Sequence, residues 1–267
     1  MSTSAVFKVG LIAGLAAFCG GAAEPLPITR LAGATFKVKD LEQARQYYGK
    51  MLGYTDMSGV PTKSIYRLND GQYLEFQAGA PDNFRLLYIT MLTPNPEKLR
   101  VLLSQRGIRS TKAKGYITIK DPENNEIRFV RSLGTKEIHA NGFSSHLLHI
   151  GVNSDHESDS LALYRDGLGF SEMLRGGPKP NEIRWVILNM PETPGDWVEV
   201  MVAREQPPAM RQHICFEVAD TQSTYKELTS RGMPDRFKPF AAQNHRMIMN
   251  LRDPNGLRVE IMGETTR

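Results

Sequence analysis

An internal repeat constrains the fold of this chain more than any other feature. The segments 40–54 and 155–170 both read as a helix that ends Tyr-x-x-x-Leu-Gly-aromatic, and 116 residues separate the two tyrosines, Tyr48 and Tyr164. A glycine directly after such a leucine is typical of a helix C-terminus, where the chain adopts the left-handed conformation. A fixed period of this kind indicates that one structural unit occurs more than once.

Two further matches extend the repeat. Leu99–Gly107 corresponds to Thr224–Gly232 at an offset of 125, and Asp121-Pro122 corresponds to Asp253-Pro254 at an offset of 132. The offset grows along the chain, as loop insertions in the second copy would produce. We therefore expect two copies of one architecture over most of the chain.

Short alternating or continuous apolar stretches surround the predicted helices and indicate strands. We expect an α+β fold in which four βαβββ units pair into two tandem domains, residues 24–141 and 142–267, joined by the polar linker Ser132–Ser145. The predicted strands are Ala34–Val38, Tyr73–Gln77, Leu86–Met91, Ile127–Val130, Leu147–Val152, Trp185–Leu188, Val198–Val202, Ile214–Val218 and Val259–Met262.

The first 23 residues do not fit the repeat. Lys8 precedes an uncharged apolar run, Val9–Phe18, and small residues follow at Gly20–Ala23. This order predicts a secretory signal peptide, residues 1–23, that is cleaved after Ala23. The apolar run is short for a membrane span, so we expect a periplasmic or secreted protein without stable membrane insertion. A retained N-terminal anchor is the alternative.

Composition limits the partners of the chain. Hydrophobic residues make up 40% and charged residues 23%, which is typical of a globular protein with its own core. Cleavage removes Lys8 and lowers the formal net charge from +4 to +3. No basic run with interleaved aromatic residues is present, which argues against nucleic acid. Cys215 then remains alone, so no internal disulfide forms. We expect a small-molecule substrate, and a homo-oligomer stays open.

The repeated units resemble the vicinal oxygen chelate superfamily, which includes glyoxalase I, bleomycin-resistance proteins and type I extradiol dioxygenases. The resemblance rests on the Tyr-x-x-x-Leu-Gly-aromatic helix end and the Asp-Pro before each closing strand, and it spans about Ile28 to Gly263. It implies cup-shaped domains, and four units in tandem look like the extradiol dioxygenase arrangement.

In this superfamily a metal ion lies inside the cup, with ligands from the first and last strands of each unit. The resemblance places His149, His213 and Glu260 at ligand positions of the second domain, and Glu199 at the remaining one. Two imidazoles and a carboxylate suit a divalent ion with open coordination positions. We expect Fe, Zn, Ni, Co or Mn.

The first domain provides an internal control for this ligand set. The repeat offsets map His149 to Gly33, His213 to Tyr88 and Glu260 to Arg128, whereas Glu199 maps to Glu75. Three of the four ligand positions have thus lost their ligand type. We expect the first domain to be metal-free. Because Glu75 persists there without a metal, a ligand role and a bystander role for Glu199 stay open.

Three functions are compatible with this pattern. A glyoxalase-like lyase or isomerase needs the metal and a carboxylate base, for which Glu199 is the catalytic candidate, and we favour this reaction. An Fe(II) extradiol-type ring-cleaving dioxygenase is the first alternative. A non-catalytic binder of the bleomycin-resistance type is the second, although such a binder does not need the metal ligands.

The residues around the ligands weaken the dioxygenase alternative. Where extradiol enzymes typically carry two histidines and a tyrosine, this chain has Val198, Ala241 and Asn250. Only His245 remains nearby as a catalytic acid or base. We predict Arg246 and Asn250 as substrate contacts.

Overall fold

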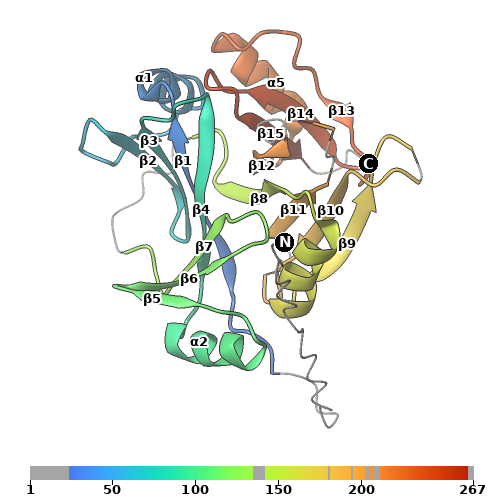
Figure 1. The fold of residues 1–267 in the computed structure, drawn as a ribbon. Helices are drawn as coiled ribbons and strands as arrows, with labels where there is room; N and C mark the ends of the chain where they lie inside the picture. The colour runs from blue at the N-terminus through green and yellow to red at the C-terminus, as the bar shows by residue number, and fades with distance from the viewer. Residues whose placement is uncertain are drawn as a thin grey trace, which may run out of the picture.

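The computed structural model describes residues 24–134, 142–179, 181–193, 195–202, 205–206 and 211–263. The predicted signal peptide and the central part of the predicted linker lie outside the described residues. Within the described ranges, no helix has both the length and the apolar character that a bilayer crossing requires. The described chain forms two sheets, one from each half of the sequence (Figure 1).

The first sheet has seven strands in the order β2-β3-β1-β4-β7-β6-β5. Its first unit contains β1 (Arg30–Val38), a helix made of α1 (Leu41–Ala44) and the π-helical η1 (Arg45–Met51), β2 (Lys63–Asn69) and β3 (Gln72–Ala78). Its second unit contains β4 (Phe84–Leu92), α2 (Pro96–Gln105), β5 (Thr111–Ala113), β6 (Tyr116–Lys120) and β7 (Glu126–Val130). The two units meet where β1 pairs antiparallel with β4.

The second sheet has eight strands in the order β13-β14-β15-β12-β8-β11-β10-β9. Its first unit contains β8 (His146–Asn153), α3 (Glu157–Leu161) with the π-helical η2 (Ala162–Gly167), β9 (Ser171–Gly176), β10 (Trp185–Asn189) and β11 (Trp197–Met201). Its second unit contains β12 (His213–Val218), α5 (Thr221–Ser230), β13 (Phe240–Ala241), β14 (Met247–Arg252) and β15 (Arg258–Gly263). This order repeats that of the first sheet, which confirms the α+β fold with two tandem sheets.

One unit departs from the expected βαβββ pattern. In the first unit the strand after the helix is reduced to a single bridge between Asp56 and Tyr66. The Asp56 carboxylate accepts hydrogen bonds from the backbone N–H groups of Ser58, at 2.9 Å, and Ile65, at 3.0 Å. Hydrogen bonds from the backbone to a nearby side chain compete with pairing between strands, and Pro61 lies shortly after this turn. The first sheet therefore has one strand fewer than the second.

The repeated helices begin and end as their sequences predict. Asp40 caps the first helix, with its carboxylate 2.9 Å from the Gln43 backbone nitrogen, and Asp220 caps α5 in the same way. Gly53 and Gly169 follow the π-helical segments with φ of 82° and 81°. These are left-handed conformations that favour glycine, so both repeat glycines act as helix C-caps.

The other repeated residues join the two halves. The Tyr48 hydroxyl in the first half donates to the Asp253 carboxylate in the second at 3.1 Å, and Tyr164 donates to Asp121 in the reverse direction at 3.2 Å. All four side chains are buried. The tyrosine and the Asp-Pro aspartate of the repeat are therefore the two ends of reciprocal contacts across the interface.

A second reciprocal pair uses the repeated Arg-Gly. Arg106 donates to the carbonyl of Gly167 at 2.8 Å, and Arg231 donates to the carbonyl of Met51 at 3.2 Å. Each arginine thus binds the end of the π-helical segment in the opposite half. The two halves are related by approximate twofold symmetry in their contacts as well as in their topology.

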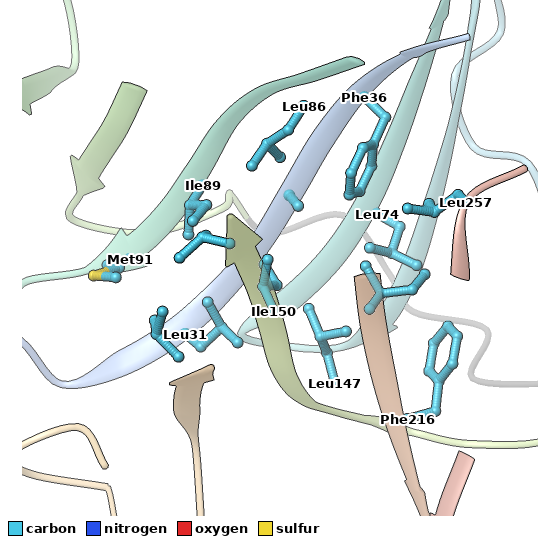
Figure 2. Close-up of a cluster of buried hydrophobic side chains, with 14 of the residues drawn as sticks. Leu31, Phe36, Leu74, Leu86, Ile89, Met91, Leu147, Ile150, Phe216 and Leu257 are labelled. Atoms are coloured by element: carbon cyan, nitrogen blue, oxygen red, sulfur yellow. The ribbon is translucent and has the colours of Figure 1, made fainter. Parts of the chain in front are cut away.

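A shared core lies between the sheets. One continuous cluster of buried apolar side chains takes residues from both halves. In Figure 2, Leu31 and Phe36 of β1 lie opposite Leu147 and Ile150 of β8. The first strand of each half therefore buries one face in this core, and the other face of β8 lines the cup that holds the candidate site.

Candidate metal centre

Four adjacent strands of the second sheet bring four candidate ligands together. The strands follow one another in the order β11, β8, β12 and β15, and they carry Glu199, His149, His213 and Glu260. Cys215 of β12 pairs with both His149 and Glu260, and Glu199 pairs with Gly151, so the four residues lie at nearly the same height in the sheet. Residues that are far apart in the sequence thus share one face.

The ligand atoms of this cluster converge closely. One atom from each of His149, Glu199, His213 and Glu260 lies within 4.8 Å of the others. The two histidine Nε2 atoms are 3.0 Å apart, and Glu199 Oε2 lies 3.1 Å from His149 Nε2 and 3.3 Å from His213 Nε2. Glu260 Oε2 lies 3.5 Å and 3.7 Å from the same nitrogens. Glu199 is therefore as close to the centre as the three other residues.

The surroundings hold both imidazoles in position for a metal ion. The His213 Nδ1 lies 2.9 Å from the Arg211 carbonyl, which can only accept. A proton is thereby assigned to Nδ1, and Nε2 faces the cluster, where it donates to a carboxylate when protonated and can bind a metal ion through its lone pair when deprotonated. The His149 ring stacks on Trp197, with ring centroids 5.0 Å apart. Oriented Nε2 atoms with two carboxylates fit a divalent first-row ion.

Charge in the cluster also favours a cation. Burial opposes ionisation of Glu199, but hydrogen bonds from His149 and His213 hold the pKa of its carboxyl well below the usual range. Burial likewise opposes ionisation of Glu260, and the charges of His213 and Arg258 lower its pKa. Two ionised carboxylates are therefore buried together, and a divalent ion would neutralise both of them.

The register of the first sheet identifies the residues that are equivalent to the four candidate ligands. In its sheet, Thr35 pairs with both Glu75 and Tyr88, as Gly151 pairs with Glu199 and His213 in the second sheet. Thr90 pairs with Arg128, as Cys215 pairs with Glu260. The register thus reproduces the equivalences that the sequence offsets gave.

The positively charged side chain of Arg128 occupies the cup of the first half. The Arg128 guanidinium carbon lies 3.3 Å from the centroid of the Tyr88 ring and 4.8 Å from that of Tyr116. Arg128 also forms an ion pair with Glu126, two residues earlier on β7. A fixed positive charge beside Tyr88 repels a metal ion, which agrees with the expected loss of the site in this half.

A cavity of about 350 Å³ leads to the ligand cluster in the second half. Glu199 and Glu260 form part of its wall, together with Trp185, Asn250 and Arg258. The Asn250 Oδ1 is buried and has no hydrogen-bond partner among the described residues. The structure thus places Asn250, one of the two predicted substrate contacts, where a small molecule would bind.

The structure does not bring His245 or Arg246 to this cavity. His245 is exposed at the turn between β13 and β14, with φ of 62°, and its backbone nitrogen donates to the Ala242 carbonyl. Arg246 instead binds the Glu217 carboxylate at 2.5 Å and the Gly263 carbonyl at 3.0 Å. The tight turn directs His245 to solvent, so neither prediction is supported at this position.

Sequence reasoning missed one charged residue of the site. Arg258 precedes Glu260 by two residues on β15 and lines the cavity. Its Nη2 lies 3.4 Å from Glu260 Oε1 and 2.6 Å from His213 Nδ1. Arg258 Nη2 and His213 Nδ1 are both donors in the assigned tautomer, so the short contact between them is not a hydrogen bond. The period-two alternation of the strand, which puts residues 258 and 260 on one face, was the available signal.

Comparison with known proteins agrees with this architecture. Residues 146–261 match the sequence model of the Glyoxalase/Bleomycin resistance protein/Dioxygenase superfamily. No functionally curated protein gives a sequence match. The matched segment contains all four candidate ligands and nearly the whole second sheet. The second half of the chain therefore matches this superfamily in sequence, in agreement with the resemblance of the repeat motifs.

Solved structures extend the likeness to both halves. Homoprotocatechuate 2,3-dioxygenase from Brevibacterium fuscum superposes with a TM-score of 0.73 at 16% identity, over 92% of this chain and 74% of that chain. The 2,3-dioxygenase LapB from Pseudomonas sp. KL28 superposes with a TM-score of 0.71 at 13% identity, over 90% and 93% of the two chains. The fold of this chain is therefore that of tandem extradiol dioxygenases.

Proposed function

We propose that this chain is a divalent-metal-dependent enzyme that binds a small molecule through two adjacent oxygen atoms. The observation that carries the proposal is the convergence of His149, Glu199, His213 and Glu260 at the cavity. When bound there, the ion acts as a Lewis acid that stabilises negative charge on the substrate oxygens. The superfamily match of residues 146–261, which contain all four candidate ligands, supports the same function.

The position of Glu199 among the candidate ligands favours a proton-transfer reaction that does not use dioxygen. An ion with six coordination positions and four protein ligands keeps two positions, which a substrate with two adjacent oxygens fills. No coordination position of the ion then remains for dioxygen. Glu199 is buried, ionised and next to the substrate position, so it can accept a proton from a carbon beside a carbonyl group. We therefore propose glyoxalase-like lyase or isomerase chemistry.

Ring cleavage is the second candidate, and the comparisons support it better than the lyase reaction. Both solved structures named above are extradiol-type dioxygenases. At 16% and 13% identity, however, the likeness concerns the fold alone. The cavity wall has Ala241 and Asn250 at the positions where that family typically carries acid–base side chains. Among the described lining residues, the ionisable groups other than the ligands are arginines.

Metal analysis tests the common part of the proposal. The purified protein, reconstituted separately with Fe, Zn, Ni, Co and Mn, should retain about one ion per chain after gel filtration. His213→Ala should abolish this retention, whereas Glu75→Ala, which removes the equivalent carboxylate of the first half, should leave it unchanged. Retention of no metal by the parent protein would show that the proposal is wrong.

Two assays separate the reactions. Iron-loaded protein, prepared without oxygen, is given a panel of catechols while oxygen uptake is recorded. Nickel- and zinc-loaded proteins are given methylglyoxal hemithioacetals, and exchange of the carbon-bound proton with deuterated solvent is followed by NMR. Proton exchange that depends on Glu199, without oxygen uptake, supports the lyase or isomerase. Oxygen uptake with ring cleavage would establish the second candidate instead.

We also propose export of this protein, on the N-terminal pattern alone. N-terminal sequencing of protein recovered from the periplasm or medium should begin at Glu24. A mature chain that retains residues 1–23 would refute cleavage after Ala23.

A further inference from the structure

Arg258 places a permanent positive charge at the inner end of the cavity. It lies on β15 opposite His213 in the register, and its side chain is 20% exposed. Among the described residues, its one carboxylate partner is Glu260, at 3.4 Å. An arginine remains charged at any pH at which the protein is folded, so this charge must be balanced locally.

The charge balance around Arg258 changes when a metal ion binds. This argument rests on the proposed function. Glu199 and Glu260 carry two negative charges, and a divalent ion between them neutralises both. Arg258 is then left with no net counter-charge, because its partner carboxylate is already committed to the ion. The inner end of the cavity therefore carries about one excess positive charge, which a bound substrate has to offset.

The other arginine of the cavity does not contribute to this excess. Arg184 forms ion pairs with Glu182 at 2.6 Å and with Glu205 at 3.2 Å. Neither of these carboxylates belongs to the ligand cluster, so the charge of Arg184 is balanced with or without a metal. The uncompensated charge is thus confined to Arg258, directly beside the ligands.

The position of Arg258 defines where the substrate carries its charge. Its guanidinium contacts the side chains of His213 and Glu260 themselves, rather than the outer cavity. A negative group on a distant tail of the substrate would not reach it. Asn250 lies opposite Glu260 on the neighbouring strand, with its amide oxygen unpaired among the described residues, and so offers an acceptor for a hydroxyl group.

We propose that the substrate binds as a monoanion whose negative charge lies on the oxygen pair that faces the metal, as in a 2-hydroxycarboxylate. Arg258 pairs with the charged oxygen, and the Asn250 amide accepts from a hydroxyl group. Arg258 is then a specificity-determining residue, which selects anionic over neutral molecules of the same shape.

Lactate and lactamide test this selection, because they differ mainly in charge. Each is titrated into cobalt-loaded protein while the visible absorption of the cobalt ion is recorded, so the readout is binding and not turnover. The ratio of lactate to lactamide affinity in the parent protein should exceed the ratio for free cobalt ions by at least about tenfold. Equal ratios would overturn the proposal without any variant.

Variants then assign the effect to one side chain. Arg258→Met should weaken lactate binding by at least about tenfold and lactamide binding by less than about twofold, and Arg258→Lys should restore much of the lactate affinity. Arg258→Gln serves if the methionine variant does not fold. Arg184→Met, at the same cavity, should change neither affinity. Equal weakening of both ligands, or no weakening, would overturn the proposal.

The outcomes also separate this proposal from the proposed function. If the parent protein retains none of the five metals, both fail. If it takes up cobalt and binds lactate independently of Arg258, the metal enzyme stands and the selection for anions is wrong.

Discussion

Metal binding should stabilise the folded chain by an amount that depends on the second half alone. Four ligand atoms within 4.8 Å are already assembled in the fold, and the unfolded chain has no such site. At a free metal concentration of about 100 times Kd, binding to the folded state alone contributes about 2.7 kcal/mol. For a chain of this size, that corresponds to a rise in Tm of about 5–10 °C.

Removal of one ligand should remove most of this increment. Removal of a side chain that hydrogen-bonds a metal ligand already weakens metal affinity by about 10–100-fold. Removal of the ligand His213 itself should therefore weaken the affinity by at least about 100-fold. At the same free metal, a 100-fold weaker site contributes only about 0.4 kcal/mol. The metal-dependent shift of His213→Ala should therefore be about 1–2 °C.

Differential scanning calorimetry with and without metal measures these shifts. The comparison is made within each variant, so a change in stability caused by the substitution itself cancels. Glu75→Ala is the matched control, because Glu75 occupies the position in the first sheet that Glu199 occupies in the second. A full shift in His213→Ala, or an equal loss in Glu75→Ala, would refute the assignment of the metal to the second half.

Other predictions concern the halves and their interface. Burial raises the pKa of Asp253 to about 6, so the native state binds this proton more tightly than the unfolded chain, and stability falls as the pH rises from about 4 to 7. This loss should amount to about 2–3 kcal/mol of unfolding free energy, and Asp253→Asn should abolish it. Urea titrations at several pH values measure both. Tyr48→Phe and Tyr164→Phe, which remove equivalent buried hydrogen bonds, should each cost about 1–3 kcal/mol of unfolding free energy; a large difference between them would contradict the symmetry. Gly33→Ala should destabilise the fold by several kcal/mol in the same assay, because its Cβ would lie 2.0 Å from the Tyr73 carbonyl oxygen at φ of +146°.

The parts of the fold that sequence predicted are those that bury one or both faces. β1, β4, β8 and β12 carry continuous apolar residues, and each was found near its observed position. The strands β2, β5, β6, β9, β13 and β14 were missed. In β2, the sequence KSIYRLN mixes charged and apolar residues without a clean period, and the Arg67 aliphatic stem is buried while its guanidinium reaches backbone carbonyls. Such strands are set by pairing with their neighbours, which a local pattern does not reveal.

The site divides in a similar way. The candidate ligands His149, His213 and Glu260 could be predicted because the family resemblance supplied the ligand positions and the repeat supplied a control. Glu199 was left open, since its counterpart Glu75 survives without a metal, and only the three-dimensional distances place it at the cluster. The predicted acid–base role of His245 relied on its proximity in sequence to β14. This proximity does not determine the direction of a side chain at a turn with positive φ.

The closing strands of the two halves differ in the charges that they carry toward the cup. β15 carries Arg258 and Glu260 in that order, whereas β7 carries Glu126 and Arg128 at the equivalent positions. The same ion pair occurs in both halves with its charges exchanged, so the position of Glu260 in the second cup holds the guanidinium of Arg128 in the first. Reversal of this pair in the first half would not by itself restore a metal site. The position equivalent to His149 is Gly33, where the backbone of Tyr73 leaves no room for any side chain. Backbone packing and charge therefore both disfavour a metal ion in the first half, whose apolar core is continuous with that of the second half.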